Sequence, residues 1–329
     1  MIRRRDLVLL LGAAALAPQL ARAQAKPPAG RLWRIGFLSS ASAAAYAYRV
    51  EALRAGLRDL GYVEGRNFAF EFRWAEGKYE RLPELAAELV RLKVDILYTH
   101  GTPGAQAAKK ATNAIPIIVS AVSDPVATGL VASLRQSGGN ITGLMFFVQE
   151  LNEKRLELVR EVFPKARRVA ILSNADNESM KPIIPALENA AKALKLELRR
   201  FEVRGPAEFE SAFSAMADWR ADAVVPIEDA MLLANDRAIV EQSARRKLPA
   251  IGWNEVAEKG GFLAYGADFI DISRRSASYV DRILKGAKPA ELPVDRSTKY
   301  ELVINMKTVK ALGVKLPQAV LVRADRVIE

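Results

Sequence analysis

Cysteine is absent from the 329-residue sequence, and histidine occurs only once, at His100. Without cysteine there is no disulfide, no thiolate nucleophile and no cysteine to carry a lipid anchor. A conventional zinc site needs several cysteine or histidine ligands, and the usual nucleophile and base pairs would all have to use this one imidazole. P-loop, GxSxG and GxGxxG motifs are also missing. We therefore expect no catalytic residue, no metal and no cofactor, and we expect His100 to lie in a cleft wall or on the surface.

Long runs of charge of one sign are missing too, although the formal net charge is +11. Lysine and arginine are scattered between acidic residues along the predicted helices. No stripe of arginine and aromatic residues and no known nucleic-acid motif interrupts this pattern. We interpret the positive charge as ordinary solvated surface and predict no nucleic-acid partner.

The apolar run near the N-terminus is shorter than the roughly 20 residues needed to span a bilayer. Residues 3–6 read RRRD, residues 7–17 are apolar, and Ala21-Arg22-Ala23 precedes Gln24. This order is typical of a cleaved export signal, and the paired arginines resemble a twin-arginine signal, with the general secretory route as the alternative. We expect a cleaved signal at 1–23, a tether at 24–32, and a soluble monomer in the periplasm.

Beyond the tether, short apolar runs alternate with segments of helical spacing. Strands are predicted at 33–38, 68–74, 94–98, 115–119 and 140–145, and helices include one over 126–135. We expect Thr102 to cap, and Pro103 to open, the helix that follows the third strand. Such alternation indicates an α/β fold with a doubly wound parallel sheet.

The same order of elements restarts near residue 168. RVAIL at 168–172 corresponds to RIGFL at 34–38, and the strands predicted at 197–203, 222–226 and 248–252 correspond to the next three. The offset is roughly 130 residues, the size of an α/β domain. We predict two Rossmann-like lobes, with lobe 1 at 33–145 plus about 267–294 and lobe 2 at 146–266 plus about 295–329. Several crossings of the chain between the lobes would form a hinge.

Polar residues follow the predicted strands, at the sheet edge where ligands bind in open parallel sheets. The candidate ligand-binding residues are Ser39, Ser40, Thr102, Ser120 and Asp124 in lobe 1, and Asn174, Glu228, Asp229, Trp253 and Asn254 in lobe 2. Hydroxyl groups and helix N-termini suit a carboxylate, each such contact contributing about 0.3–1 kcal/mol. An acidic pair suits an ammonium group.

Each candidate has a purely structural alternative. Serine and threonine can cap helices, and the acidic pair can serve as an N-cap and a first-turn charge. Asp124 precedes Pro125 and can belong to a turn. Trp253, like Trp74, can stack on a ligand ring or pack in the core.

Several segments of the chain, taken together, resemble the sequence of a known protein family. They are GFLSS at 36–40, GYVEGRN at 61–67, GTPGAQAAKKAT at 101–112, SDPVATGLVASLRQSGGNITG at 123–143, EKRLELVRE at 153–161, YGAD at 265–268, RILKG at 282–286 and LPV at 292–294. Together they resemble the family of exported ABC-transporter substrate-binding proteins that includes tryptophan- and tyrosine-binding members. The resemblance implies a type I periplasmic-binding-protein fold, with two lobes, three crossovers and a ligand in the cleft between them.

The implied function is capture of a small molecule, with an amino acid or small carboxylate favoured, and its delivery to an ABC permease. Tryptophan-binding relatives carry a Thr-Asp-Asn-like turn where this chain has Glu228-Asp229, so the ligand class stays open. The alternatives are a ligand-sensing receptor subunit of a signalling protein, a carrier of sugars or nucleosides, and an enzyme on the same scaffold.

We predict that export removes residues 1–23 and leaves a protein that begins at Gln24. The small residues Ala21 and Ala23, on either side of Arg22, provide the cleavage pattern. Mass spectrometry of the periplasmic fraction would measure the mass of the exported chain. A mass that includes the apolar run at 7–17 would contradict the prediction.

Overall fold

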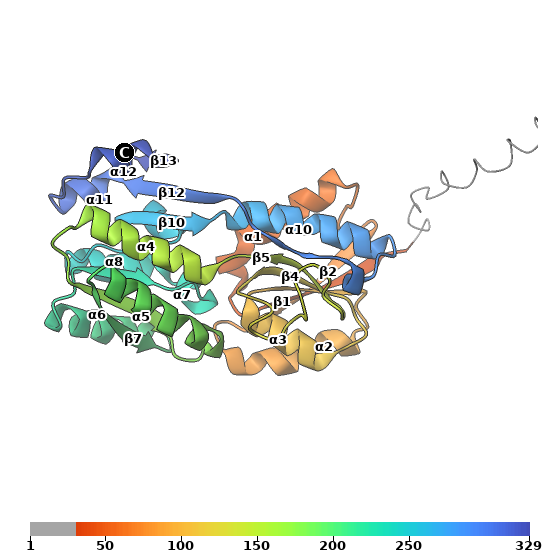
Figure 1. Ribbon diagram of the computed structural model, residues 1–329. Helices are drawn as coiled ribbons and strands as arrows, with labels where there is room; N and C mark the ends of the chain where they lie inside the picture. The colour runs from red at the N-terminus through yellow and green to blue at the C-terminus, as the bar shows by residue number, and fades with distance from the viewer. Residues whose placement is uncertain (1–30) are drawn as a thin grey trace, which may run out of the picture.

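The computed structural model describes residues 31–329, so the predicted export signal and nearly all of the predicted tether lie outside the described residues. Figure 1 shows two lobes side by side, each with a sheet covered by helices. Lobe 1 holds the N-terminal part of the described chain together with helix α10. Lobe 2 holds the middle of the chain and the C-terminus.

Lobe 1 is built on a six-stranded sheet with the order β11-β5-β4-β3-β1-β2, in which every neighbouring pair is parallel. Its strands are β1 (Trp33–Ser39), β2 (Phe68–Trp74), β3 (Ile96–His100), β4 (Ile117–Val122), β5 (Ile141–Met145) and β11 (Val294–Arg296). Strands β3, β4 and β5 are buried along their whole length. Continuous apolar runs of this kind are typical of parallel strands covered on both faces.

Helices cover both faces of this sheet. Its helical segments are α1 (Ala43–Asp59), η1 (Tyr79–Arg81), α2 (Leu82–Arg91), α3 (Thr102–Ala111), α10 (Phe269–Leu284) and η4 (Pro289–Glu291). Helices α1 and α10 share one hydrophobic core with the sheet, while α2 and α3 share a second core on the opposite face. Helix α1 begins where the Ser42 hydroxyl accepts a hydrogen bond from the Ala45 N–H group, and it ends before Gly61 at a φ of 86°.

Lobe 2 contains a three-stranded sheet, β7-β6-β8, and a four-stranded sheet, β13-β12-β10-β9, joined by a bridge between Val224 and Ala250. Its strands are β6 (Arg168–Asn174), β7 (Glu197–Val203), β8 (Ala223–Pro226), β9 (Ile251–Gly252), β10 (Leu263–Ala267), β12 (Tyr300–Asn305) and β13 (Arg326–Ile328). Strands β10 and β12 are antiparallel, which departs from the all-parallel expectation. Strand β12 enters directly from lobe 1, so no crossover helix sets its direction.

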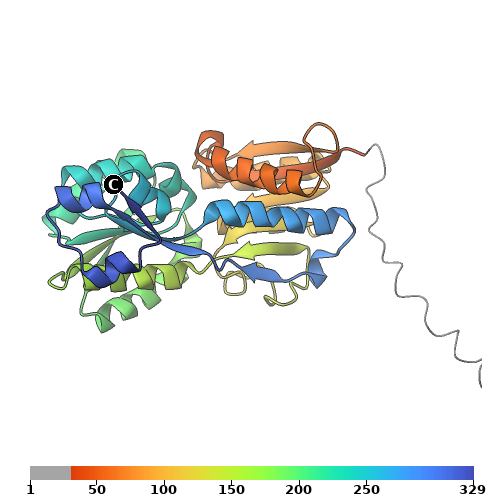
Figure 2. The same cartoon turned by 90° about the horizontal axis from the view of Figure 1, so that it is seen from above.

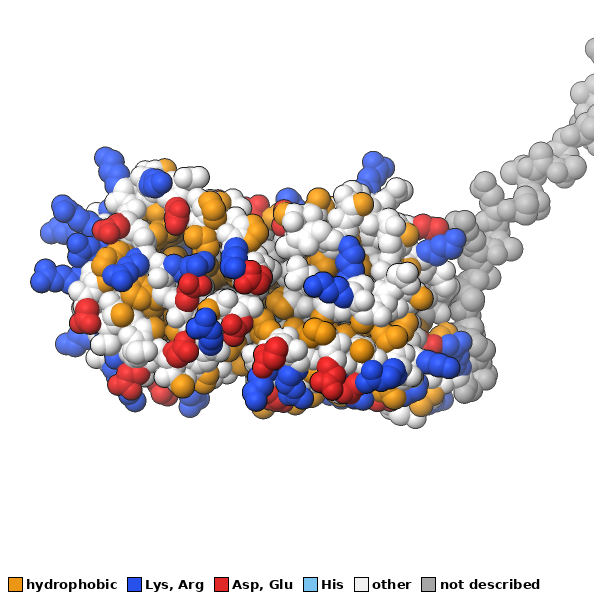
Figure 3. All heavy atoms as spheres, turned by 90° about the horizontal axis from the view of Figure 1, so that it is seen from below, with side chains coloured by type: hydrophobic (Ala, Val, Ile, Leu, Met, Phe, Trp, Pro, Cys, Tyr) orange, Lys and Arg blue, Asp and Glu red, His pale blue; other side chains and the backbone are white. Residues whose placement is uncertain are grey.

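The helical segments of lobe 2 surround these sheets. They are α4 (Val148–Val162), η2 (Glu178–Ile183), α5 (Ile184–Ala193), η3 (Pro206–Glu208), α6 (Phe209–Asp218), α7 (Ala230–Ala234), α8 (Asp236–Arg245), α9 (Asn254–Glu258), α11 (Met306–Ala311) and α12 (Gln318–Val322). On the face shown in Figure 3, basic and acidic side chains are interspersed over both lobes. Surface ion pairs such as Lys154–Glu157 join some of them.

The sequence repeat is visible as a repeated hydrogen-bond pattern. In lobe 1, the Asp95 carboxylate accepts the Arg34 N–H group at 2.8 Å, and the Asp95 N–H group donates to the Arg34 carbonyl at 2.8 Å. In lobe 2, Asp222 makes the same two bonds to Arg168, at 2.9 and 2.8 Å. Each aspartate thereby ties the entry of the third strand to the first strand of its lobe.

The chain passes between the lobes three times, as Figures 1 and 2 show. The crossings follow β5 at residues 145–148, β10 at 267–269 and β11 at 296–300. One cluster of buried apolar residues extends through both lobes, but only these short segments connect the two sheets, so a relative motion of the lobes would bend the chain there.

The helix predicted over 126–135 is wrong, because this segment forms turns. The Asp124 carboxylate accepts the N–H groups of Val126 and Ala127, both at 3.0 Å, and Gly129 has a φ of 70°. The Pro125 carbonyl then accepts two further N–H groups. Local bonds of this kind compete with a helix, and they are strongest where aspartate, proline and glycine occur together.

Gly56 sets the distance between helices α1 and α10. A Cβ atom at residue 56 would lie 2.3 Å from the Arg274 carbonyl oxygen and 2.9 Å from the Ala277 Cβ atom. The backbones of α1 and α10 therefore approach so closely here that only glycine fits at residue 56. This contact fixes α1 against α10, and the first turns of these two helices carry Tyr46 and Phe269, which line the cavity described below.

We predict that Gly56→Ala lowers the free energy of unfolding by about 2 kcal/mol or more. The overpacking cost exceeds the roughly 1 kcal/mol that alanine gains over glycine within a helix. Gly205→Ala is the control, because Gly205 has extended backbone at a φ of −174° and no atom within 4 Å of an added Cβ. Urea unfolding of both variants measures the difference, and equal stabilities would contradict the prediction.

Candidate functional site

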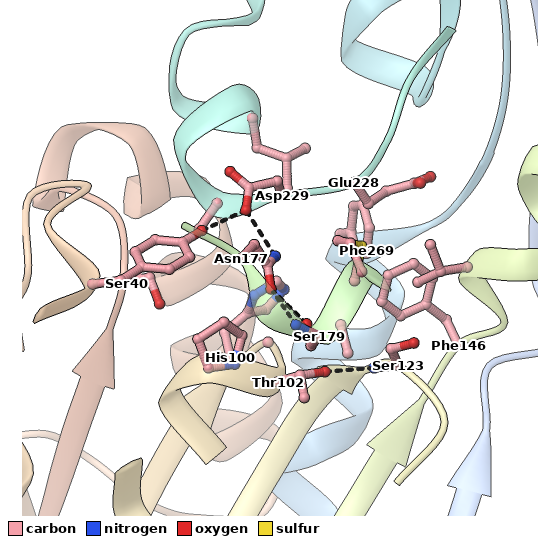
Figure 4. Close-up of a pocket in the computed structure, with 18 of the residues that line it drawn as sticks. Ser40, His100, Thr102, Ser123, Phe146, Asn177, Ser179, Glu228, Asp229 and Phe269 are labelled. Carbon is pink, nitrogen blue, oxygen red and sulfur yellow. Dashed lines mark hydrogen bonds between the residues drawn. The ribbon is translucent and has the colours of Figure 1, made fainter. Parts of the chain in front are cut away.

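A cavity lies between the lobes, where the carboxyl ends of the lobe 1 strands face lobe 2 (Figure 4). Aromatic rings form much of its wall, namely Tyr46, Tyr79, His100, Phe146 and Phe269. Its free volume is about 40 Å³, which is room for about three water molecules. An amino acid with an aromatic side chain is several times larger, so the lobes must separate before such a molecule enters.

Four of the ten residues predicted from the sequence line this cavity: Ser40, Thr102, Glu228 and Asp229. Asp124 lines a neighbouring groove and caps the turn described above. The Ser39 hydroxyl accepts the Ala41 N–H group at 3.1 Å within its own turn.

The remaining predicted residues do not line the cavity. Ser120 is fully buried in β4, and Asn174 donates to the Asp229 carboxylate at 3.1 Å. Trp253 is buried in the lobe 2 core, and Asn254 donates to Glu301 at 3.2 Å. Trp74 stacks on Phe72 with ring centroids 5.4 Å apart, so it also packs within the protein.

The lobe 1 wall presents hydrogen-bond donors. Helix α3 begins directly after Gly101, which has a φ of 80° and no side chain to cap the helix. Thr102 is not the N-cap that we predicted, because its hydroxyl accepts the Ser123 N–H group at 3.1 Å instead. The Ser40 hydroxyl is 2% exposed and has no hydrogen-bond partner among residues 31–329. An uncapped helix N-terminus beside an unpaired hydroxyl is suited to an anion.

Asp229 lies on the opposite wall, in lobe 2, and is the N-cap of α7. Its carboxylate accepts the N–H groups of Met231 and Leu232 at 2.8 and 3.2 Å, as well as the amide of Asn174. Its other oxygen accepts the Asn177 amide at 2.8 Å and, from lobe 1, the Tyr79 hydroxyl at 2.7 Å (Figure 4).

No lysine or arginine of the described chain pairs with Asp229. Burial raises the pKa of Asp229, and the hydrogen bonds from Tyr79 and the two asparagines only partly oppose that effect. This carboxylate therefore lies next to the cavity with hydrogen bonds from neutral donors and without a side-chain cation to offset a negative charge.

Glu228 is adjacent in sequence but has a different role. Its carboxylate pairs with the Arg155 guanidinium, and the two side chains are 2% and 0% exposed. Asn152 donates to the same carboxylate at 3.2 Å, and Arg155 also donates to the Tyr265 carbonyl at 2.9 Å. The Glu228 charge is thus neutralised inside lobe 2, where it joins α4 to the start of α7.

Several lining residues were not among our sequence candidates. Tyr46 lies in α1 and Phe269 at the start of α10, and a large apolar side chain in a helix is equally consistent with core packing, so the sequence did not single them out. Tyr79 lies just past the end of β2 and Asn177 just past the end of β6, and those positions were the available clue. His100 lies in the cavity wall.

Within residues 31–329, no helix is both long enough and apolar enough to cross a membrane. The same residues contain no group of three or more acidic or histidine side chains placed to hold a metal ion.

A family profile described as ABC transporter substrate binding protein matches residues 35–328. The chain is 30% identical over 260 residues to the tyrosine-binding protein of Clostridioides difficile (strain R20291), which covers 79% of this chain and 74% of that protein. Both matches extend over both lobes.

Two solved structures are similar to this chain over most of its length. An ABC domain from Streptococcus pneumonia in complex with L-Trp is 26% identical, with a TM-score of 0.81 over 89% of this chain and 100% of that chain. The ligand-free, open structure of a substrate binding protein with adhesive properties from Clostridium difficile is 25% identical, with a TM-score of 0.64 over 90% and 99%. The fold and the family profile, which spans nearly the whole described chain, together show that this protein belongs to the ABC transporter substrate binding protein family.

Proposed function

We propose that this protein binds an amino acid between its lobes in the periplasm and, as a soluble monomer, delivers it to an ABC permease. The observation that carries the proposal is the pairing of two unlike walls. The uncapped α3 N-terminus and the unpaired Ser40 hydroxyl suit a carboxylate, while the unpaired charge of Asp229 suits an ammonium group. Amino acids carry both groups, so neither wall alone satisfies the ligand.

The aromatic lining supports an aromatic amino acid such as L-tryptophan or L-tyrosine. Phe146, Phe269 and Tyr46 provide ring faces and edges for stacking. The binding of tyrosine and tryptophan by the two relatives agrees with this ligand class. Glu228 is excluded from the ammonium contact in our proposal because Arg155 already neutralises it.

Ligand binding and lobe closure are coupled in this proposal. The greater similarity to the L-Trp complex than to the open relative supports a closed arrangement for the described chain. In that arrangement Tyr79 donates to the carboxylate of Asp229. A ligand ammonium group would bind the same oxygen of Asp229. The hydrogen bond from Tyr79 must therefore break, as the lobes open, before the ligand can bind there. A ligand held by both walls would then stabilise a closed form with a wider cavity than the described one, relative to the open form.

The test of this function is a thermal-shift screen of the mature protein with amino acids, small carboxylates, sugars and nucleosides. A ligand at 100 times its dissociation constant adds about 2.7 kcal/mol to stability. We expect L-tryptophan or L-tyrosine to raise the melting temperature, and their decarboxylated amines not to. A shift produced only by sugars or nucleosides would contradict the proposal. Chemical conversion of the ligand on recovery would indicate an enzyme instead.

We predict different consequences for substitutions of the two neighbouring carboxylates. Asp229→Asn keeps an oxygen for the Met231 and Leu232 N–H groups and removes a buried charge that has no cation partner. The free energy of unfolding should fall by about 1–3 kcal/mol, because the amide NH2 group replaces the oxygen that accepts the Tyr79 and Asn177 donors. Affinity for the amino acid should fall more than tenfold, since a charged hydrogen bond contributes about 1.5–3 kcal/mol.

Glu228→Gln is the matched control. It leaves the buried Arg155 without its counter-charge, so stability should fall by about 3–5 kcal/mol. Urea unfolding and isothermal calorimetry on both variants separate the two roles. Equal stability losses, or unchanged ligand affinity in Asp229→Asn, would show that Asp229 has only a structural role.

A further inference from the structure

The only histidine of the chain is held between two side chains of helix α1. His100 Nδ1 lies 2.9 Å from the Tyr46 hydroxyl, and His100 Nε2 lies 3.0 Å from a guanidinium nitrogen of Arg49. The Tyr46 ring also meets the imidazole edge-to-face, with ring centroids 5.0 Å apart. Tyr46 and His100 both line the cavity, whereas Arg49 lies behind them.

Arginine determines the direction of every hydrogen bond in this group. A guanidinium group has donors and no acceptor, so His100 Nε2 must accept the bond from Arg49. The proton of the neutral imidazole is then on Nδ1, and Nδ1 donates to the Tyr46 oxygen. The hydroxyl proton of Tyr46 is therefore not used by His100. Tyr46 has no other hydrogen-bond partner among the described residues, and its ring lines the cavity.

We infer that Arg49, His100 and Tyr46 form a one-way hydrogen-bond chain that makes the Tyr46 hydroxyl a donor to the ligand, so that Tyr46 recognises an acceptor such as a carboxylate oxygen. This inference rests on the proposed function. It adds a recognition residue to the wall that carries Ser40 and the α3 N-terminus, and it assigns a positioning role to His100.

The surroundings of Arg49 keep its charge in place. The side chain is 2% exposed, and its guanidinium lies over the rings of Tyr46 and Phe269 at 4.7 and 4.3 Å. It also donates to the Tyr48 hydroxyl at 2.9 Å, which in turn donates to Glu255 of lobe 2 at 2.6 Å. The chain therefore extends from a contact between the lobes to the cavity.

The same surroundings keep His100 neutral. Burial and the Arg49 charge lower the pKa of His100 well below its ordinary value. Burial raises the pKa of Tyr46 to about 12. The other ionisable groups near this pair are Tyr48 on α1, Tyr79 on η1, Tyr98 on β3, Asp229 before α7 and Glu255 on α9. Neither His100 nor Tyr46 changes its charge near neutral pH, so the direction of the chain persists there.

Nitrogen-15 NMR of histidine-labelled mature protein tests the chain directly, because a single histidine gives a single pair of ring signals. We expect Nδ1 to carry the proton, Nε2 to be unprotonated, and no titration as the pH falls from 8 through 6.5. A proton on Nε2, or titration with the ordinary pKa of about 6.5, would overturn the inference. This result does not depend on which ligand the protein binds.

A binding measurement tests the role of Tyr46. Tyr46→Phe removes the hydroxyl and should weaken L-tryptophan binding at least tenfold, as the loss of a hydrogen bond to a charged group predicts. Tyr98→Phe is the matched control, because the Tyr98 hydroxyl bonds to Ser276 at 2.9 Å inside the core and does not line the cavity. The affinity of Tyr98→Phe for L-tryptophan should stay within about twofold of the wild type.

Equal affinities in Tyr46→Phe and the wild type would overturn the donor role of Tyr46. If wild-type protein bound no amino acid, the proposed function would fail, and the NMR result would still decide the chain.

Discussion

Each buried polar group between the lobes needs a hydrogen-bond or charge partner. We infer that the groups without such a partner in the protein select the ligand. A buried charge or donor without a partner costs more free energy than a hydrogen bond returns. Glu228 meets the requirement through Arg155 inside lobe 2, and Asp229 meets it through five neutral donors. Ser40 does not meet it within the described chain. In our proposal the ligand completes two groups: the Ser40 hydroxyl, which has no partner, and the Asp229 carboxylate, which has hydrogen bonds but no cation.

Some of these polar groups find their partner in the other lobe. Tyr79 of lobe 1 donates to Asp229 of lobe 2, and Tyr48 of lobe 1 donates to Glu255 of lobe 2. These contacts exist only while the lobes are close, and the three crossings allow separation. Opening exposes the polar groups to water, which replaces the lost hydrogen bonds at modest cost. An equilibrium between closed and open forms balanced in this way can be shifted by the few kcal/mol that a small ligand supplies.

The fold class and the family predicted from the sequence are confirmed. Local patterns predicted the main strands well: β2 and β7 begin and end at the expected residues. Both segments contain aromatic or branched residues and are followed by a turn that contains glycine, which is typical of a strand. The segment 126–135 failed because hydrogen bonds from Asp124 and the conformation of Gly129 outweighed its helix-forming residues. Thr102 failed as a cap because its hydroxyl bonds to Ser123, a residue 21 positions away.

By itself, the sequence determined the alternation of strands and helices, the repeat of the two lobes, and the sheet edge at which polar residues gather. These features follow from periodicities that each segment carries within itself. Only the tertiary structure decided which polar side chains are available to a ligand. Glu228 and Asp229 are neighbours with the same chemistry, yet Arg155 lies 73 residues from one and Tyr79 lies 150 residues from the other. Electrostatic environment depends on distances in space, and no local pattern encodes a partner that far along the chain.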